Sequence, residues 1–344
     1  MGRLMVPDAG YMEPVEGRQL RFVAPRRVEV ERVEVRPPGA GEVLVRTRWS
    51  GISAGTELLA YRGELDESLE LDETLPSLRG TFRYPFAYGY SCVGEVERSG
   101  PDGPAVGTTV FAFHPHQDVF AVGAGDVVAV EGVDARVATL FPLVETALQV
   151  SLDAGPLLEE PVLVMGLGAV GLLTASLLQR SGADVLGVDP RRDRREIAGA
   201  FGLPVVDASE IRDEVAARTS GAGVPLVVDA TGSPPALADA LDLLAHEGEV
   251  LVCSWYGAKE VRLPLGGAFH RRRLSIRSTQ VSTIPARLAE RWDVARRRRA
   301  AMRLMPELPL KLLATNELPF ERAAEAFDVL DRGDLGVMHV ALRY

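Results

Sequence analysis

A glycine-rich segment carries the clearest chemical signal in this sequence. It reads Gly166-Leu167-Gly168-Ala169-Val170-Gly171 and follows an apolar run, Val162-Leu163-Val164-Met165. The pattern Gly-x-Gly-x-x-Gly predicts a dinucleotide site when it joins a buried strand to a helix. Gly166 would form the tight turn, Gly168 would leave room for a pyrophosphate, and Gly171 would let the helix pack close to the strand. Backbone N–H groups at the start of the helix would attract the phosphates.

A carboxylate stands where such a site would hold the adenosine ribose. Asp189 ends the next strand-like run, about 20 residues after the first glycine, and would accept hydrogen bonds from the ribose hydroxyls. Its negative charge would repel a 2′-phosphate, which favours NAD as the coenzyme. Four cations follow at once and are able to accommodate that phosphate, so NADP stays possible: Arg191, Arg192, Arg194 and Arg195.

The elements that must position this turn are predicted by the spacing of apolar residues. Strand-like runs occupy 161–165, 184–188, 205–206, 225–229 and 249–253, with helix-like stretches at 170–180, 192–201 and 235–244. This alternation with short links predicts a parallel sheet covered by helices. Residues 19–130 instead contain short valine-rich runs (27–35, 41–49, 93–96, 108–113), which are typical of an all-β unit. Helices are predicted again at 138–152, 285–305 and 323–330, before a last strand at 338–343.

These elements predict an α/β fold with two units. We assign the β unit to residues 1–148, the doubly wound unit to 149–283, and a C-terminal segment, 284–344, that returns to the first unit. The doubly wound unit is therefore inserted rather than terminal. Residues 1–17 contain Pro7, Gly10, Pro14 and Gly17 and are predicted to be a poorly ordered lead-in.

Composition excludes several function classes. The 344 residues carry a formal charge of -10, whereas binding to nucleic acid depends on clustered cations. No apolar run approaches the ~20 residues that span a bilayer. Cys92 and Cys253 are too few for a disulfide framework or a four-cysteine zinc site. We expect a cytoplasmic protein that acts on a small molecule, with no nucleic-acid or membrane partner, and we expect the arginines at 296–299 to face mostly solvent.

Several segments resemble the medium-chain dehydrogenase/reductase superfamily. They are 41–45 (GEVLV), 50–57 (SGISAGTE), 89–96 (GYSCVGEV), the glycine-rich turn and 229–232 (DATG). The chain looks closest to the branch named for bacteriochlorophyllide dehydrogenase, and is similar to a group that shares 114–117 (HPHQ), 254–257 (SWYG) and 278–281 (STQV). The resemblance implies a GroES-like β domain, an inserted Rossmann domain with the nicotinamide in the cleft between them, and a homodimer built through the edge of the Rossmann sheet.

The same resemblance exposes departures from the zinc-dependent members. Those enzymes carry a cysteine in the segment that matches 51–56, a histidine at the second position of the segment that matches 89–91, and a third cysteine or glutamate. Here the corresponding residues are Ser53, Tyr90 and Glu145. Catalytic zinc takes three ligands from histidine, cysteine and carboxylate, so we expect no zinc. One alternative site would combine His114, His116 and Glu145. Because Pro115 separates the histidines, a tight turn or a hydrogen-bonded pair is the simpler interpretation.

Without a metal, hydrogen-bond donors must polarise the reacting carbonyl. Tyr90 is expected to face the cleft, with Ser53, Thr56, His114 and His116 as further candidates, because a histidine relays protons near neutral pH. Tyr90 filling the vacated zinc cavity and His114 bonding the backbone are the structural alternatives. On the coenzyme side, Thr231 follows a Rossmann strand, and Trp255 and Tyr256 follow another, where side chains either reach the nicotinamide or pack.

Three functions are compatible with these residues. The first is a zinc-independent NAD(P)-dependent dehydrogenase that acts on the secondary alcohol or ketone of a specialised metabolite. The second is an NAD(P)H-dependent enone or quinone reductase, which needs carbonyl hydrogen bonding but no Lewis acid. The third is a nucleotide-binding protein without enzymatic activity.

Overall fold

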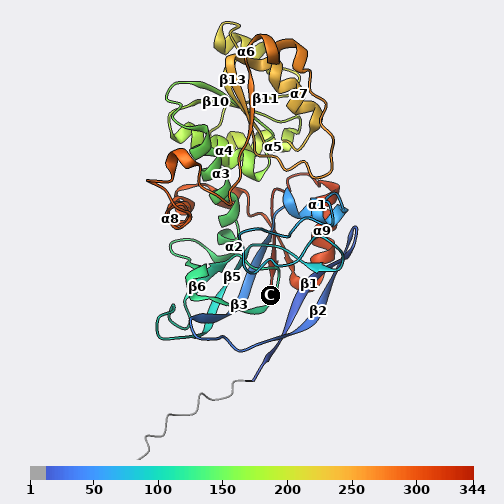
Figure 1. The fold of residues 1–344 in the computed structure, drawn as a ribbon, viewed down its shortest axis with the longest axis vertical. Helices are drawn as coiled ribbons and strands as arrows, with labels where there is room; N and C mark the ends of the chain where they lie inside the picture. Colours follow the sequence, from blue (N-terminus) through green and yellow to red (C-terminus); the bar gives the residue numbers. More distant parts are fainter. Residues whose placement is uncertain (1–12) are drawn as a thin grey trace, which may run out of the picture.

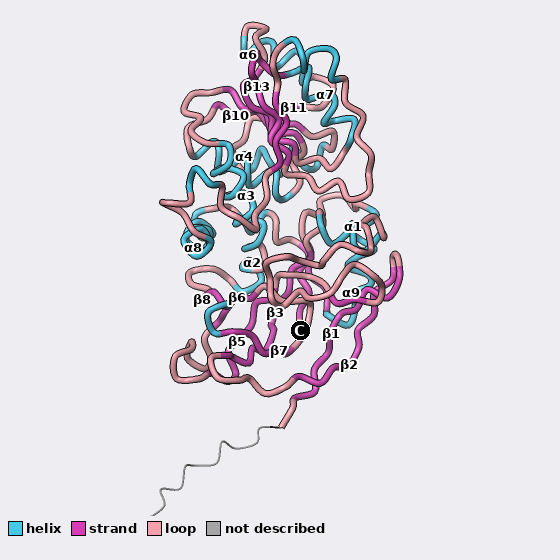
Figure 2. The backbone as a smooth tube through the Cα atoms, in the orientation of Figure 1, coloured by secondary structure: helices cyan, strands magenta, loops and turns pink. Residues whose placement is uncertain are grey.

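The computed structural model describes residues 13–344, and Figure 1 shows an elongated molecule in two halves, with helix α3 (Phe141–Ala154) running between them. Each half has its own β-structure, one sheet in one half and two in the other, and Figure 2 shows the strands of the two halves as separate groups. No helix in residues 13–344 has the length and apolar character needed to cross a membrane.

One half is built on a six-stranded parallel sheet with the strand order β11-β10-β9-β12-β13-β14. The strands are β9 (Pro161–Met165), β10 (Asp184–Val188), β11 (Val205–Val206), β12 (Val224–Asp229), β13 (Leu244–Val252) and β14 (Ser275–Ser278). The connecting helices are α4 (Ala169–Arg180), α5 (Arg192–Ala200), α6 (Ile211–Thr219) and α7 (Pro234–Leu243). The middle of β9 is buried, as expected for a strand covered on both faces. The direction of winding reverses between β9 and β12, which opens a crevice at the carboxyl ends of these strands.

The other half contains two sheets, in which every strand pair is antiparallel except β15 with β16. The larger has the order β15-β16-β3-β5-β6-β8, with β7 also paired to β3, and the smaller has the order β2-β1-β4. The strands are β1 (Val15–Ala24), β2 (Arg27–Val35), β3 (Glu42–Ile52), β4 (Phe86–Ala87), β5 (Cys92–Ser99), β6 (Thr109–Ala112), β7 (Val119–Gly123), β8 (Val127–Ala129), β15 (Asn316–Pro319) and β16 (Val340–Arg343). The remaining helices are α1 (Thr56–Arg62), α2 (Ala135–Ala138), α8 (Val294–Leu304) and α9 (Ala323–Arg332).

The end of the chain lies in the larger sheet of the β half. Strand β16 pairs antiparallel with β3, so that Val340 lies opposite Ile52 and Arg343 lies opposite Trp49. Strand β15 pairs parallel with β16. The α/β fold, with a β unit interrupted by a doubly wound unit, therefore agrees with the sequence prediction.

Two predicted segments differ from the structure. The prediction of a poorly ordered lead-in over 1–17 is wrong for its last residues, because Val15–Gly17 already belong to β1 and pair with β2. Residues 1–12 lie outside the described part of the chain. The helix predicted at 285–305 begins only at Val294. Pro285 starts a short 3-10 turn instead, and Asp293 caps the true helix by accepting a hydrogen bond from the Arg296 backbone N–H.

A single apolar cluster crosses from one half to the other. Phe111 on β6, Val144 on α3 and Leu173 on α4 are all fully buried in it. Helix α3 packs against α8 and against α4. Helix α4 belongs to the half built on the parallel sheet, which we call the coenzyme-type half after the glycine-rich turn it contains. Burial of large side chains on both sides of α3 fixes the relative position of the two halves, and so the shape of the space between them.

Candidate active site

The glycine-rich turn joins β9 to α4, as the pattern predicts. Gly166 has a φ of +87°, which favours glycine, and a Cβ there would lie 2.7 Å from the Ala230 carbonyl oxygen. A Cβ on Gly171 would lie 1.9 Å from the Gly166 oxygen, so the turn requires glycine at both positions. A Cβ on Gly168 would meet nothing within 4 Å. Gly166 and Gly171 are therefore required for the close packing of the turn, whereas Gly168 faces open space.

Asp189 lies directly beside this turn. One oxygen of its carboxylate accepts a hydrogen bond from the Leu167 backbone N–H at 2.9 Å, and the other accepts one from the Arg191 N–H at 2.8 Å. A cavity of about 390 Å³ opens here, lined by Gly166, Asp189, Pro190, Arg194, Ser209 and Thr231, among others. Its position at the carboxyl ends of β9, β10 and β12 is where a doubly wound sheet binds the adenosine of a dinucleotide.

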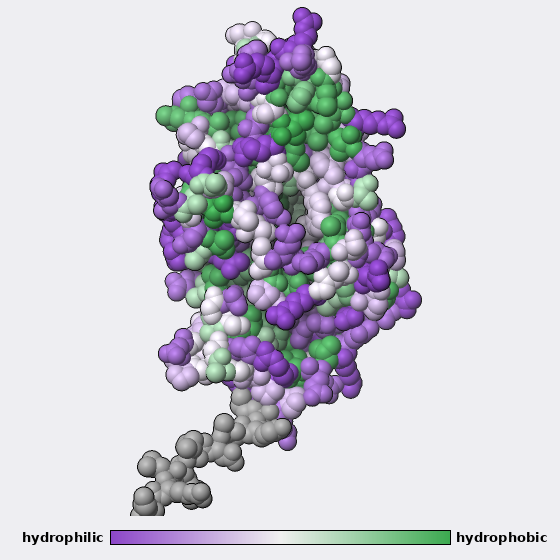
Figure 3. All heavy atoms as spheres, viewed as in Figure 1, coloured by the Kyte–Doolittle hydropathy of each residue, from purple (hydrophilic) through white to green (hydrophobic). Residues whose placement is uncertain are grey.

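A second cavity, of about 420 Å³, lies between the two halves. We call it the cleft, and Figure 3 shows the hollow at this level of the molecule. Its lining comes from both halves and includes Ser53, Thr56, Tyr90, Gly168, Thr231, Trp255, Gly333 and Met338. The structure thus brings three hydroxyl side chains of the β half, all predicted from the sequence, to the same space as the glycine-rich turn.

The Tyr90 hydroxyl is held in its protonated form. Burial raises its pKa well above the ordinary value, and the Glu57 charge raises it further, while hydrogen bonds with Ser53 and Thr56 offset part of the shift. The preceding residue, Gly89, has a φ of +108° and packs against His116, whose imidazole would lie 2.5 Å from a Cβ at this position. A phenol that keeps its proton can donate a hydrogen bond into the cleft across the physiological pH range.

His116 does not face the cleft, which corrects the prediction that it relays protons to a substrate. Its side chain is completely buried, with Nε2 2.8 Å from Glu57 Oε2 and Nδ1 2.7 Å from the Ser50 hydroxyl. The other Glu57 oxygen accepts a hydrogen bond from the Ser53 backbone N–H at 2.8 Å. His116 and Glu57 therefore support the 53–56 loop from beneath.

His114 also lies away from the cleft, contrary to prediction. Its ring stacks on Phe120 with 3.9 Å between centroids, and Nδ1 lies 3.0 Å from the Pro115 carbonyl oxygen. It lines a separate cavity with Arg21 and Arg83. Burial lowers the pKa of His114 to about 4. A neutral, backbone-bonded histidine outside the cleft has no contact with a substrate there.

Glu145 is an internal ion-pair residue, which corrects its assignment as a catalytic or metal-binding group. It is 2% exposed, and Arg297 contacts it at 2.9 Å, with Arg298 at 3.6 Å. Arg297 also donates to Gln149 at 2.6 Å. Burial raises the Glu145 pKa, and the two arginines oppose that shift. Arg297 is itself buried, so the prediction that the 296–299 run faces solvent is wrong at this position.

The residues at the expected zinc positions do not fit the ion. Ser53 and Tyr90 offer neutral oxygens, and the Glu145 carboxylate is already paired with arginine. Zinc in proteins takes its ligands from histidine nitrogen, cysteine sulfur and free carboxylate. Within residues 13–344, no group of three such side chains is arranged to hold a metal ion.

Of the two aromatic residues after β13, one reaches the cleft. Trp255 lines it, with 43% of its surface exposed. Tyr256 instead donates its hydroxyl hydrogen to Asp229 Oδ2 at 2.6 Å, and it lines neither the cleft nor the cavity beside Asp189. The hydroxyl of Thr231 donates to the other oxygen of Asp229 at 2.6 Å, and this residue lines both cavities.

Other cleft residues carried no signal in the sequence. Gly333 and Met338 come from the returning C-terminal segment, and Lys259 comes from the loop after β13. Arg62 reaches the cleft from the end of α1 and is held by Asp331 at 2.5 Å. No local motif marks these four positions. Gly333 and Met338 reach the cleft only because the C-terminal segment returns to the larger sheet of the β half.

Comparisons with known proteins agree with this geometry. Residues 169–297 match the family described as zinc-binding dehydrogenase, a range that excludes Ser53, Tyr90 and Glu145. The chain is 25% identical to D-guloside 3-dehydrogenase of Escherichia coli K12 over 297 residues, covering 80% of this chain and 84% of the relative. It is 28% identical to 2-desacetyl-2-hydroxyethyl bacteriochlorophyllide A dehydrogenase of Rhodobacter capsulatus over 315 residues, covering 84% and 86%.

The fold has close counterparts among solved structures. One is an Escherichia coli CFT073 protein described as a short chain alcohol dehydrogenase and solved with NADH. It superposes with a TM-score of 0.76 at 18% identity, and the match covers 96% of this chain and 99% of the other. At this identity the likeness establishes the fold, including a coenzyme-type half and a β half in the same order.

Proposed function

This chain is a member of the medium-chain dehydrogenase/reductase superfamily, and on that premise we propose that it transfers hydride between NAD(P) and the secondary alcohol or ketone of a small metabolite. The observation that carries the proposal is the shared cleft. Tyr90, Ser53 and Thr56 face the space into which Gly168 and Trp255 open from the coenzyme-type half. Donors on one wall and a dinucleotide turn on the other are what hydride transfer to a carbonyl requires.

The coenzyme would lie along the carboxyl end of the parallel sheet. Asp189 and Thr231 line the adenosine end, the start of α4 after Gly168 faces the pyrophosphate, and Trp255 borders the nicotinamide end. When bound there, the nicotinamide supplies or accepts the hydride. The backbone N–H groups at the start of α4 offer partial positive charge to the phosphates.

Tyr90 is the group we assign to the substrate oxygen. Its raised pKa keeps the hydroxyl protonated, so it donates a hydrogen bond to a carbonyl and stabilises the negative charge that develops during reduction. Ser53 and Thr56 hydrogen-bond Tyr90 and can pass a proton between it and water in the cleft. Hydroxyl donors of this kind replace the polarising role of a metal, and we therefore propose that the reaction is zinc-independent.

The relatives favour the alcohol-dehydrogenase reaction over enone reduction, because the curated relatives compared above are named as dehydrogenases. D-guloside 3-dehydrogenase is named for a sugar derivative, and we propose a polyhydroxylated substrate for this chain on that basis. The test is reduction of keto-sugar substrates with nicotinamide coenzyme deuterated at the reactive carbon. Deuterium on the carbon that bears oxygen supports the proposal, and deuterium on a carbon β to a carbonyl contradicts it.

We also propose a homodimer formed through strand β14. This strand is the edge of the parallel sheet, and Ser275, Arg277 and Ser278 on it are exposed. An unpaired strand edge offers backbone donors and acceptors to a second copy. Arg277→Pro would block the pairing, and size-exclusion chromatography with light scattering would show a monomer for that variant and a dimer for the unaltered chain.

A further inference from the structure

The arginines that follow Asp189 are all paired with carboxylates of their own region. The pairs are Arg191 with Asp193 at 2.7 Å, Arg192 with Glu196 at 2.8 Å, Arg194 with Asp189 at 3.3 Å, and Arg195 with Asp207 at 2.7 Å. An anionic 2′-phosphate would have to compete with these carboxylates for an arginine. The cluster that left NADP open in the sequence is therefore close to neutral in the fold.

Arg191 is the most tightly held of the four. Its Nε and Nη2 donate to the two oxygens of Asp193 at 3.1 and 2.7 Å, which is a bidentate pair. Nη1 donates to the Gly333 carbonyl at 2.9 Å and Nη2 to the Asp334 carbonyl at 3.2 Å. Four of the five guanidinium N–H groups are thus used within the protein.

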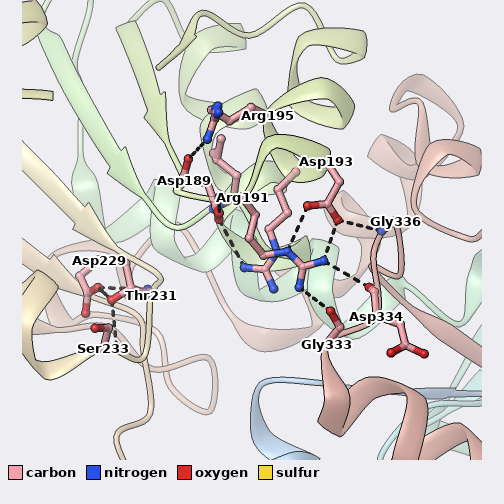
Figure 4. Close-up of polar contacts among 12 residues, drawn as sticks. Asp189, Arg191, Asp193, Arg195, Asp229, Thr231, Ser233, Gly333, Asp334 and Gly336 are labelled. Carbon is pink, nitrogen blue, oxygen red and sulfur yellow. Dashed lines mark hydrogen bonds and ion pairs between the residues drawn. The ribbon is translucent and has the colours of Figure 1, made fainter. Parts of the chain in front are cut away.

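These contacts join the two halves of the molecule. Gly333 and Asp334 belong to the loop after α9, and Gly336 of that loop donates its backbone N–H to Asp193 at 2.7 Å. Figure 4 shows Arg191 and Asp193 facing this loop, next to Asp189. We call Arg191, Asp193 and the 333–336 loop the clasp. Asp193 contributes to it twice, as the counter-ion of Arg191 and as an acceptor for Gly336.

We propose that Asp193 determines the choice of coenzyme, by holding Arg191 in the clasp and so denying a cation to the 2′-phosphate of NADP. The proposal deepens the proposed function and rests on it in one respect, that the cavity beside Asp189 binds adenosine. Arg191 lines that cavity as well as the cleft, so its guanidinium is near enough to serve a phosphate only if the clasp releases it.

The other arginines do not take over this role. Arg194 has a buried Nε without a hydrogen-bond partner, but its Nη1 bonds Asp189, and the two charges cancel beside the ribose position. Arg195 donates to the Asp189 carbonyl at 2.7 Å and pairs with Asp207. Arg192 pairs with Glu196 at the exposed surface and lines neither the cavity beside Asp189 nor the cleft. Release of Arg191 is thus the change that adds a positive charge to the site.

The test compares two fragments that differ only in the 2′-phosphate. Binding of 5′-AMP and of adenosine 2′,5′-bisphosphate to the full chain is measured by calorimetry at low salt. The unaltered chain is expected to prefer 5′-AMP. Asp193→Asn removes the charge that holds Arg191 while keeping the side-chain shape, and should raise relative affinity for the bisphosphate by about tenfold, the scale of one charge-assisted hydrogen bond.

Three further variants separate this effect from a general change in charge. Glu196→Gln removes one negative charge from the same helix and should leave the preference unchanged. In the double variant Arg191→Ala, Asp193→Asn, the gain should disappear, because the freed cation is gone. Arg191→Ala alone should give no gain either, which keeps the test valid if Asp193→Asn is poorly folded by its melting curve.

The proposal is overturned if the unaltered chain prefers the bisphosphate, if Asp193→Asn behaves like Glu196→Gln, or if the gain persists without Arg191. Failure of the proposed function gives a different pattern, in which neither fragment binds to any of the variants. A normal preference for 5′-AMP that Asp193→Asn does not change would contradict only the role of Asp193.

Discussion

Glu57 and His116 form a completely buried hydrogen-bonded pair directly beneath the loop that carries two of the cleft hydroxyls. The Nε2–Oε2 distance is 2.8 Å, and the second oxygen of Glu57 accepts the backbone N–H of Ser53 at 2.8 Å. One carboxylate therefore links a core histidine to the wall of the cleft. The position of Ser53 and Thr56 depends on a contact that no substrate touches.

Replacement of Glu57 by Gln should lower both stability and turnover. Loss of one partner from a buried hydrogen-bonded pair costs about 1–3 kcal/mol of unfolding free energy. The displaced loop should reduce turnover with little effect on coenzyme affinity, because Glu57 lies away from the glycine-rich turn. Glu16→Gln is the control, since Glu16 pairs with Arg32 at the surface and should cost less than about 0.5 kcal/mol in urea unfolding.

Replacement of Tyr90 by Phe should reduce turnover by about ten- to hundredfold while leaving coenzyme affinity nearly intact, because it deletes only the donor to the substrate oxygen. Steady-state kinetics and a coenzyme titration measure the two quantities separately. Tyr84→Phe is the matched control, as its hydroxyl donates to the Ala60 carbonyl and it does not line the cleft. Unchanged turnover in Tyr90→Phe would remove this residue from the mechanism.

Arg297 should be essential for stability although it lies in a run of arginines. Its replacement by Met leaves Glu145 buried without its main partner, and should lower the unfolding free energy by about 3–5 kcal/mol. Arg299→Met, at an exposed position of the same helix, should change it by less than about 0.5 kcal/mol. Similar unfolding midpoints for the two variants would contradict the assignment of Glu145 to this ion pair.

Stability should fall as the pH is lowered from about 6.5 toward 4. Burial lowers the pKa of His339 to about 4, and that of His114 likewise, from an ordinary value of 6.5. Between these values the unfolded chain binds protons that the folded chain does not, so acid favours unfolding. His339→Gln should flatten the slope of stability against pH in this window, whereas His246→Gln, at an exposed site, should not. Equal slopes would contradict the buried neutral state of His339.

The sequence predicted the parallel sheet well, because its strands are short apolar runs and its turn has a glycine pattern with a steric cause at Gly166 and Gly171. It predicted Tyr90, Ser53 and Thr56 at the cleft through a family resemblance. It placed His114 and His116 at the cleft, where neither lies, because Phe120 on β7 and Glu57 on α1 decide what the two rings contact.

Long-range pairing explains the other differences. Whether Glu145 is a ligand or an ion-pair partner depends on Arg297, which is 152 residues away. In the sequence, the arginines that follow Asp189 looked able to bind a 2′-phosphate. Their carboxylate partners lie close by in the chain, but local spacing does not reveal which guanidinium pairs with which carboxylate. The clasp also needs backbone groups at 333–336, whose proximity to α5 follows only from the return of the chain.

Coenzyme binding at the glycine-rich turn is the basis of every role assigned to the cleft residues, and Gly168 allows the sharpest test of it. A Cβ at this position meets nothing within 4 Å in the folded chain, so Gly168→Val should leave the melting temperature nearly unchanged while filling the space assigned to the pyrophosphate. In a titration followed by NADH and NADPH fluorescence, the unaltered chain should bind at least one coenzyme, and Gly168→Val should lose more than about tenfold in affinity. Absence of binding to both coenzymes, or equal affinity in the variant, would contradict the account.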